Sequence, residues 1–194
     1  MPRISLAETA HHLIIEQLKA GDAAIDATLG NGHDALFLAQ TIGATGQLFG
    51  FDIQETALNN SRERLQNQQI QTAVTLFQAS HAEMLTMIPQ QWHGKIQAIM
   101  FNLGYLPGAD KTLITQAAST LIALNAACQL LAEQGILTVM AYPGHAGGDA
   151  ETKQLTAWCQ QLNPQQFSYQ LILSHHNKPT APRLFVIRKR GYLL

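Results

Sequence analysis

Short apolar runs rich in β-branched and aromatic residues alternate with helical patterns along the whole chain, and this alternation limits the possible folds more than any other feature. It is typical of a mostly parallel sheet covered by helices on both faces. The predicted strands span residues 23–28, 46–52, 73–79, 96–102, 135–142, 167–174 and 183–189. The predicted helices lie near residues 6–19, 33–42, 54–67, 81–88, 111–132 and 149–162. We therefore expect an α/β fold with a seven-stranded sheet.

The last two predicted strands differ from the others in how they are connected. The segment HHNKPTAP between them is too short for a crossover helix, so we expect them to pair antiparallel at one side of the sheet. The result is a Rossmann-like, mostly parallel sheet with an antiparallel last strand. In such sheets the ligand lies beyond the carboxyl ends of the strands, where the strand order reverses. Functional residues are expected at those strand ends.

Composition suits a single compact domain over residues 1–194, because 46% of the chain is hydrophobic. No window approaches the roughly 18 consecutive apolar residues of a membrane-spanning helix, and the N-terminus lacks a signal-peptide pattern. We therefore expect a cytoplasmic protein without membrane contact. Cys128 and Cys159 lie in helical patterns without a CxxC partner, which favours buried thiols over a disulfide or a metal site.

The formal net charge of −1 indicates that any contact with nucleic acid is local. The most basic stretch is RLFVIRKRG, with Arg183, Arg188, Lys189 and Arg190, and Lys178 precedes it. Two interpretations stay open: these charges are solvated at the end of a terminal strand, or they contact RNA.

The segment DATLGNGHD follows the first predicted strand and keeps part of the spacing of a D-x-G-x-G-x-G nucleotide loop. Asp26, Gly30 and Gly32 match that spacing, and Thr28 takes the place of the first glycine. Glycines let a backbone turn tightly and approach a ligand with no Cβ in the way. The second strand ends in Asp52, where a carboxylate can accept both hydroxyls of a ribose. Two matched strand ends indicate a nucleotide-like ligand.

Both a dinucleotide and S-adenosylmethionine can use this pair of strand ends, and a glycine turn there is also common without any ligand. A dinucleotide places its pyrophosphate on the helix N-terminus, but Asp34 stands near that terminus and is unfavourable beside a diphosphate. S-adenosylmethionine has no phosphate. Its ammonium can pair with Asp26, its carboxylate can take loop amides, and its ribose suits Asp52. The sequence favours the methyl donor.

The third strand ends in QASHAEM, which places Ser80 and His81 where an adenine edge would arrive. The Ser80 hydroxyl can bond the exocyclic amine of adenine. The pattern S-x-x-E also predicts a capping box between Ser80 and Glu83 at the start of a helix. The two roles are compatible, so we expect the cap and keep the adenine contact as a hypothesis.

The fourth strand ends its apolar run on a polar amide. Asn102-Leu103-Gly104-Tyr105 has the frame of the N-P-P-Y motif of methyltransferases that act on exocyclic amino groups. The asparagine oxygen and a neighbouring carbonyl can accept N–H bonds from an amine and aim its lone pair at a methyl carbon. Tyr105 can stack on the base that carries the amine. The alternative is a turn at Asn102 and Gly104 with Tyr105 covering the core.

The fifth strand ends in AYPGHAGGDAE, a glycine-rich loop that we expect on the same rim. Tyr142, Pro143 and Gly144 are expected to contact the substrate, and the neutral imidazole of His145 can take a proton from an amine. The alternative is an exposed His145 without a role. No metal is expected, because metal-ligand spacing is missing around the histidines His11, His12, His93, His175 and His176.

Together these segments resemble the MnmM-type methyltransferases, small class I enzymes once described as rRNA methylases. The resemblance runs from DATLGNGHDALFLA through FGFDIQETAL, SHAEM, MFNLGYLPGADKTLITQAASTLIAL and MAYPGHAGGDAE to NKPTAPRLFVIRK. FNLGYLPG together with YPGH is its specific part. The resemblance implies the class I methyltransferase fold and transfer of a methyl group from S-adenosylmethionine to the primary amine of 5-aminomethyl-(2-thio)uridine at position 34 of tRNA.

The resemblance also implies that Asn102 and Tyr105 face the acceptor amine and its base, and that six residues surround the donor: Asp26, Gly30, Gly32, Asp52, Ser80 and His81. The residue patterns extend this set. Catalytic roles are expected for Asn102, Tyr105 and His145. The donor pocket is expected to comprise Asp26, Thr28, Gly30, Asn31, Gly32, Asp34, Asp52, Ile53, Gln54, Ser80, His81 and Asn102. The substrate side is expected to comprise Leu103, Gly104, Tyr105, Tyr142, Pro143, Gly144 and His145.

Three alternatives stay open: an N-methyltransferase for rRNA or a small molecule, a non-catalytic nucleotide- or RNA-binding module, and a nicotinamide-dependent dehydrogenase. The near-neutral charge fits tRNA as a partner only if the protein grips a short anticodon loop with an extruded base. A homodimer that pools two small basic patches would ease that constraint, so a homodimer is a further expectation.

Overall fold

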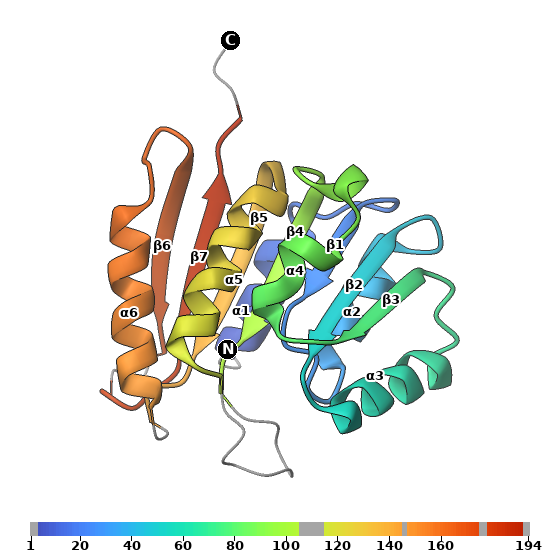
Figure 1. The fold of residues 1–194 in the computed structure, drawn as a ribbon, viewed down its shortest axis with the longest axis horizontal. Coiled ribbons are helices and arrows are strands. Elements are labelled where there is room, and N and C mark those ends of the chain that lie inside the picture. Colours follow the sequence, from blue (N-terminus) through green and yellow to red (C-terminus); the bar gives the residue numbers. More distant parts are fainter. Residues whose placement is uncertain (1–3, 105–114, 145–146, 175–177, 192–194) are drawn as a thin grey trace.

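The computed structural model describes residues 4–104, 115–144, 147–174 and 178–191, which form a seven-stranded sheet between two layers of helices (Figure 1). The strand order is β3-β2-β1-β4-β5-β7-β6. The strands are β1 (Ala23–Asp26), β2 (Gln47–Asp52), β3 (Ala73–Gln78), β4 (Ile96–Asn102), β5 (Leu131–Ala141), β6 (Phe167–Leu173) and β7 (Arg183–Lys189). Each predicted strand is present.

The pairing of the strands confirms the predicted topology. Strands β1 to β5 pair parallel with one another, whereas β7 runs antiparallel to both β5 and β6. Strand β1 lies between β2 and β4, so the chain order reverses there. The connections on the two sides of a reversal leave toward opposite faces of the sheet, which opens a crevice at the carboxyl ends of these strands.

The helices divide between the two faces. They are α1 (Leu6–Ile15), α2 (His33–Ile42), α3 (Glu55–Asn67), α4 (Met84–Met87), α5 (Ala117–Leu130) and α6 (Gly148–Gln161), with short 3₁₀ turns η1 (His81–Glu83) and η2 (Gln90–Trp92). One core cluster joins the sheet to α1, α2 and α3, and the other joins it to α4, α5 and α6. Side chains alternate between the two: Ala24 belongs to the first cluster and Ile25 to the second.

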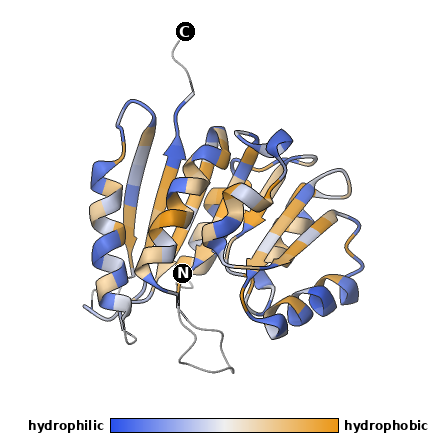
Figure 2. Cartoon of the chain, viewed as in Figure 1, coloured by the Kyte–Doolittle hydropathy of each residue, from blue (hydrophilic) through white to orange (hydrophobic). Residues whose placement is uncertain are grey.

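The hydrophobic residues gather in the strands and on the inner helix surfaces, while α3 and α6 carry many hydrophilic residues (Figure 2). Within the described ranges, no helix combines the length and the apolar character that crossing a bilayer requires.

The first residues of two elements differ from the prediction by more than one position. Strand β5 begins at Leu131 rather than near residue 135, because the polar residues after Leu131 form an irregularity: Ile96 pairs with Leu131, but Ala98 pairs with Ile136. Helix α5 begins at Ala117, and Gln116 before it is extended; the earlier part of the predicted helix, residues 111–114, lies outside the described residues.

Candidate active site

A cavity of about 760 Å³ lies at the carboxyl ends of the central strands, where the strand order reverses. Loops that follow β1 to β5 form its wall, together with side chains of α1, α2 and α5. The predicted site residues that line it are Thr28, Gly30, Asn31, Asp34, Asp52, Ile53, Gln54, Ser80, His81, Asn102, Leu103, Gly104, Tyr142 and Gly144. The topology thus brings together residues from segments far apart in the chain.

Asp26, Gly32 and Pro143 do not line this cavity. Gly32 is needed for packing: its φ is +74°, and a Cβ there would lie 2.8 Å from the Ser61 Cα on α3. It lets α2 begin close against α3 and so shapes the loop from behind. The predictions for Tyr105 and His145 fall outside the described residues.

Asp26 lies at the end of β1, directly before the residues that line the cavity. Its side chain is buried, with 1% of its surface exposed. Oδ1 accepts the Thr28 N–H at 3.1 Å, while Oδ2 is buried without a partner among the described residues. Burial, and then the negative charge of Asp34, raise the pKa of the Asp26 carboxyl well above its ordinary value. A cationic group of a ligand would offset both effects.

Asp52 is held by backbone amides of two loops. Its Oδ2 accepts the Gly30 N–H at 3.0 Å, and its Oδ1 accepts the Gln54 N–H at 2.9 Å. A carboxylate oxygen has two lone pairs, so each oxygen keeps one for a ligand hydroxyl. The glycine loop is fixed from outside as well, because the Arg64 Nε donates to the Asn31 carbonyl at 2.7 Å.

Ser80 and His81 lie at the end of β3. The predicted capping box is confirmed: the Ser80 Oγ accepts the Ala82 N–H at 3.2 Å, and the Glu83 carboxylate accepts the Ser80 N–H. The His81 ring packs edge-on against Phe101, and its Nε2 is buried without a partner among the described residues. Burial lowers the pKa of His81 to about 4, so this imidazole is neutral at physiological pH.

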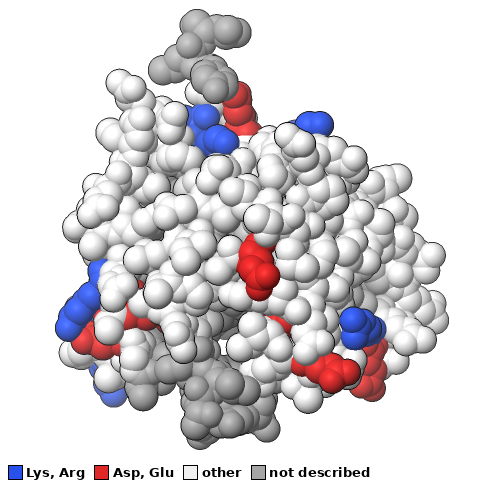
Figure 3. Space-filling model, viewed as in Figure 1, with Lys and Arg blue, Asp and Glu red and all other residues white. Residues whose placement is uncertain are grey.

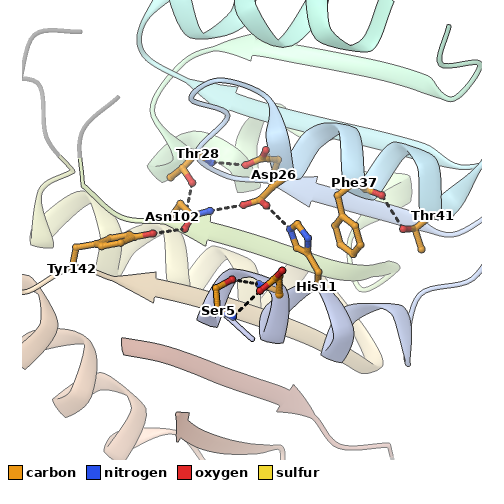
Figure 4. A network of polar contacts seen from close by, with 10 residues as sticks. Ser5, His11, Asp26, Thr28, Phe37, Thr41, Asn102 and Tyr142 are labelled. Atoms are coloured by element: carbon orange, nitrogen blue, oxygen red, sulfur yellow. Dashed lines mark hydrogen bonds and ion pairs between the residues drawn. The ribbon is translucent and has the colours of Figure 1, made fainter. Parts of the chain in front are cut away.

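Asn102 stands at the centre of a polar network at the tip of β4 (Figure 4). Its backbone N–H donates to the Thr28 Oγ1 at 2.6 Å, which ties β4 to the first loop. Its side-chain Nδ2 donates to the Asp34 Oδ2, and the Tyr142 hydroxyl lies 3.5 Å from its Oδ1. Burial, and then the charge of Asp34, raise the pKa of the Tyr142 phenol. The Asn102 amide is therefore oriented with its nitrogen toward Asp34 and its oxygen toward Tyr142.

The structure adds His11 to this network, a residue that sequence analysis considered only as a metal ligand. Its Nε2 lies 2.6 Å from the Asp34 Oδ1, and its ring stacks on Phe37 with centroids 3.8 Å apart (Figure 4). Helix α1 carries His11 into the cavity wall. No local motif marks this residue, because its place depends on how α1 packs on the sheet.

A second buried network of hydrogen bonds connects Gly104 to helix α6. The Glu151 carboxylate on α6 is 4% exposed and accepts the Thr115 hydroxyl at 2.9 Å and the Thr120 hydroxyl at 2.7 Å. The Gly104 N–H donates to the Thr115 Oγ1, and the Thr115 N–H donates back to the Gly104 carbonyl, both at 2.8 Å. No motif in the sequence marks Glu151 as part of the site. Among the described residues, no three His, Cys, Asp or Glu side chains gather as a metal site would require.

Comparison with known proteins gives independent evidence for the family of this chain. The model of the family described as "Putative rRNA methylase" matches residues 48–188. A curated relative, the tRNA (mnm(5)s(2)U34)-methyltransferase of Arabidopsis thaliana chloroplasts, is 32% identical over 97% of this chain and 70% of its own length.

Two solved structures are similar over nearly the whole chain. A protein described as a putative rRNA-methylase from Clostridium thermocellum has a TM-score of 0.90 and 34% identity, over 97% of this chain and 99% of its own. SMU.1697c, described as a putative methyltransferase from Streptococcus mutans in complex with SAH, has a TM-score of 0.83 and 33% identity, over 97% and 99% of the two chains. The chain therefore belongs to the rRNA methylase family of class I, S-adenosylmethionine-dependent methyltransferases.

Proposed function

We propose that this enzyme methylates the primary amine of 5-aminomethyl-(2-thio)uridine at position 34 of tRNA. The name of the Arabidopsis relative, a tRNA (mnm(5)s(2)U34)-methyltransferase, supports this substrate. The observation that carries the proposal is the fixed orientation of the Asn102 amide in a cavity of suitable size.

The loops after β1 and β2 fit the methyl donor. Asp52 would accept the two ribose hydroxyls on the lone pairs that its backbone contacts leave free. Asp26, buried directly before the cavity-lining Ala27 and Thr28, would balance the charge of the ammonium with its unpartnered Oδ2. Ser80 and His81 would lie at the adenine, and the donor carboxylate would take amides of the loop after β1 other than that of Gly30, which Asp52 already holds. When bound, S-adenosylmethionine supplies an electrophilic methyl group on a sulfonium.

On the acceptor side, Asn102 aligns the amine. Because its Nδ2 is held by Asp34, its Oδ1 is the atom that can accept an N–H from the substrate. That bond fixes the nitrogen and directs its lone pair toward the donor half of the cavity. Methyl transfer to a neutral amine depends mainly on alignment, so a neutral amide acceptor is sufficient. The predicted stacking of Tyr105 on the base belongs to this proposal.

Recognition of tRNA would be local. On the face shown in Figure 3, Lys and Arg side chains are few and scattered, which does not suit a long duplex held by charge. A short anticodon loop with an extruded uridine needs fewer ionic contacts. The expected homodimer and cytoplasmic location are part of the same proposal.

Mass spectrometry of nucleosides tests the proposal. The protein is incubated with S-adenosylmethionine carrying a deuterated methyl group and with tRNA from cells that accumulate the aminomethyl precursor; the tRNA is then digested. We expect the label in the wobble nucleoside of that tRNA and in no nucleoside of fully modified tRNA. Parallel reactions contain rRNA, which the family description favours as a second candidate, and free amines. Label in rRNA alone, or in free amines alone, contradicts the proposal.

A further inference from the structure

We infer that His11, held by Asp34, accepts the proton that the substrate amine must lose before methylation. The inference rests on the proposed function, because it assigns a proton acceptor for that amine. A primary aminomethyl group resembles the lysine amine, with a pKa of about 10, so near neutral pH it is an ammonium without a free lone pair. Some group at the site has to take one proton.

The geometry selects His11. Two hydrogen bonds through the Asp34 carboxylate connect it to Asn102: Oδ2 accepts from the Asn102 amide, and Oδ1 lies 2.6 Å from the His11 Nε2. A carboxylate at this distance requires the proton of the neutral imidazole to be on Nε2. The lone pair is then on Nδ1, for which the described residues offer no hydrogen-bond partner. All three side chains line the same cavity.

His11 is both fixed and accessible. Stacking on Phe37, with ring planes 6° apart, restricts its orientation. The His11 side chain is 27% exposed, so a proton on its ring can pass to solvent, whereas Asp34 is 13% exposed and sheltered. A carboxylate that positions an imidazole and balances the charge of its protonated form is the arrangement by which histidine bases commonly work.

The other titratable groups around the pair favour a cation there. Glu8 on α1 interacts with His11, Asp26 at the end of β1 interacts with Asp34, and the Tyr142 phenol faces Asp34 from the end of β5. Two of these three are carboxyl groups, and the Tyr142 phenol is neutral at physiological pH. A positive charge on the substrate or on His11 therefore enters a favourable potential.

The substrate ammonium gives one proton to the His11 Nδ1 and becomes a neutral amine, while His11 becomes an imidazolium paired with Asp34. The amine lone pair forms the new bond to the methyl carbon, and the electron pair of the broken carbon–sulfur bond stays on sulfur. The product is a secondary ammonium, and His11 releases its proton to water.

The pH dependence of kcat/KM on the aminomethyl tRNA tests this inference. In the wild type kcat/KM should rise with pH as the proton acceptor loses its own proton. His11→Gln should lower kcat/KM about 10²-fold at pH 7, with a gap that shrinks toward pH 9 as the substrate loses its own proton. His12→Gln, on the exposed side of the same helix, is the matched control and should follow the wild type. An equal loss at every pH indicates a structural role and overturns the inference, as does an unchanged profile.

Two further measurements keep the test decisive if His11→Gln folds poorly. In His11→Ala, added imidazole should restore part of the lost rate at pH 7, and failure to do so in a variant that still binds S-adenosylhomocysteine contradicts the inference. Histidine NMR without donor or tRNA should show the His11 proton on Nε2; a proton on Nδ1 overturns it. No transfer by the wild type at any pH refutes the proposed function itself, and this inference with it.

Discussion

The two halves of the cavity are built differently. In the proposed donor half, after β1, β2 and β3, Asp52, Ser80 and Arg64 bond to backbone atoms: Asp52 holds Gly30 and Gln54, Ser80 caps its own turn, and Arg64 holds Asn31. In the proposed acceptor half, side chains from distant elements bond to one another. Asn102 contacts Asp34, which is 68 residues away, and Glu151 contacts Thr115, which is 36 residues away.

This difference suggests that the two halves of the cavity have separate functions. A donor that is common to many enzymes can be held by a backbone frame that short loop motifs encode. The proposed acceptor amine has to be aligned at one atom, and the side chains proposed to align it are held by neighbours on α1, α2 and α6. Changes in the two halves should therefore have separable effects on donor binding and on turnover.

The largest effect is expected from Asn102→Ala. It removes the oxygen that we propose aligns the amine and also leaves Asp34 without its amide partner. We expect kcat to fall about 10²-fold or more, while the Kd for S-adenosylhomocysteine, measured by calorimetry, changes little. Tyr142→Phe removes only the hydroxyl that lies 3.5 Å from the Asn102 oxygen, so it should cost far less. Equal loss of turnover and donor binding in Asn102→Ala would break the division between the halves.

Asp52→Ala should affect the donor half instead. It removes the acceptor for two backbone amides and the proposed acceptor for the ribose hydroxyls. We expect the Kd for S-adenosylhomocysteine to rise at least about 10-fold, by loss of hydrogen bonds to a charged group. At saturating donor, turnover should stay close to that of the wild type. Glu55→Ala, exposed at the start of α3, is the matched control. Unchanged donor affinity in Asp52→Ala would contradict the assignment.

Acid should destabilise the folded protein through His81, which lies beyond the end of β3. Burial lowers its pKa in the folded protein to about 4, from 6.5 in the unfolded chain. The unfolded state therefore binds more protons below pH 6.5, so this stabilisation is present above that pH and is lost as the pH falls toward 4. Urea unfolding of His81→Asn should show about 2 kcal/mol less loss between pH 7 and pH 5 than the wild type. His12→Asn, exposed on α1, should lose as much as the wild type; equal losses in all three would show that His81 is not buried as neutral imidazole.

The same contrast explains what could be predicted from sequence. The alternation of strands and helices was sufficient for the sheet and its antiparallel strand, and the ends of β1 to β5 were sufficient for most cavity residues, because topology alone brings those ends together. His11, Thr115 and Glu151 could not be found this way. Their roles arise from packing between helices, and a lone histidine or glutamate in an amphipathic helix looks the same whether it faces solvent or a cavity. The early start of β5 was missed because its polar residues resemble a turn.

The smallest effect tests whether the acceptor half depends on α6. The buried Glu151 carboxylate accepts hydrogen bonds from two threonine hydroxyls, those of Thr115 and Thr120. The Thr115 hydroxyl in turn accepts the N–H of Gly104, which is two residues from Asn102. Glu151→Gln keeps the shape but weakens charge-assisted bonds, so we expect a loss of about 1 kcal/mol in the free energy of unfolding. Asp149→Asn on the same helix breaks only an exposed ion pair with Lys153 and should cost less than about 0.5 kcal/mol. If Gly104 is held through Thr115 as the structure indicates, Glu151→Gln should also lower kcat several-fold without changing donor affinity. A stability loss with unchanged kcat would confine Glu151 to folding and would leave the alignment of the amine to Asp34 and Asn102 alone.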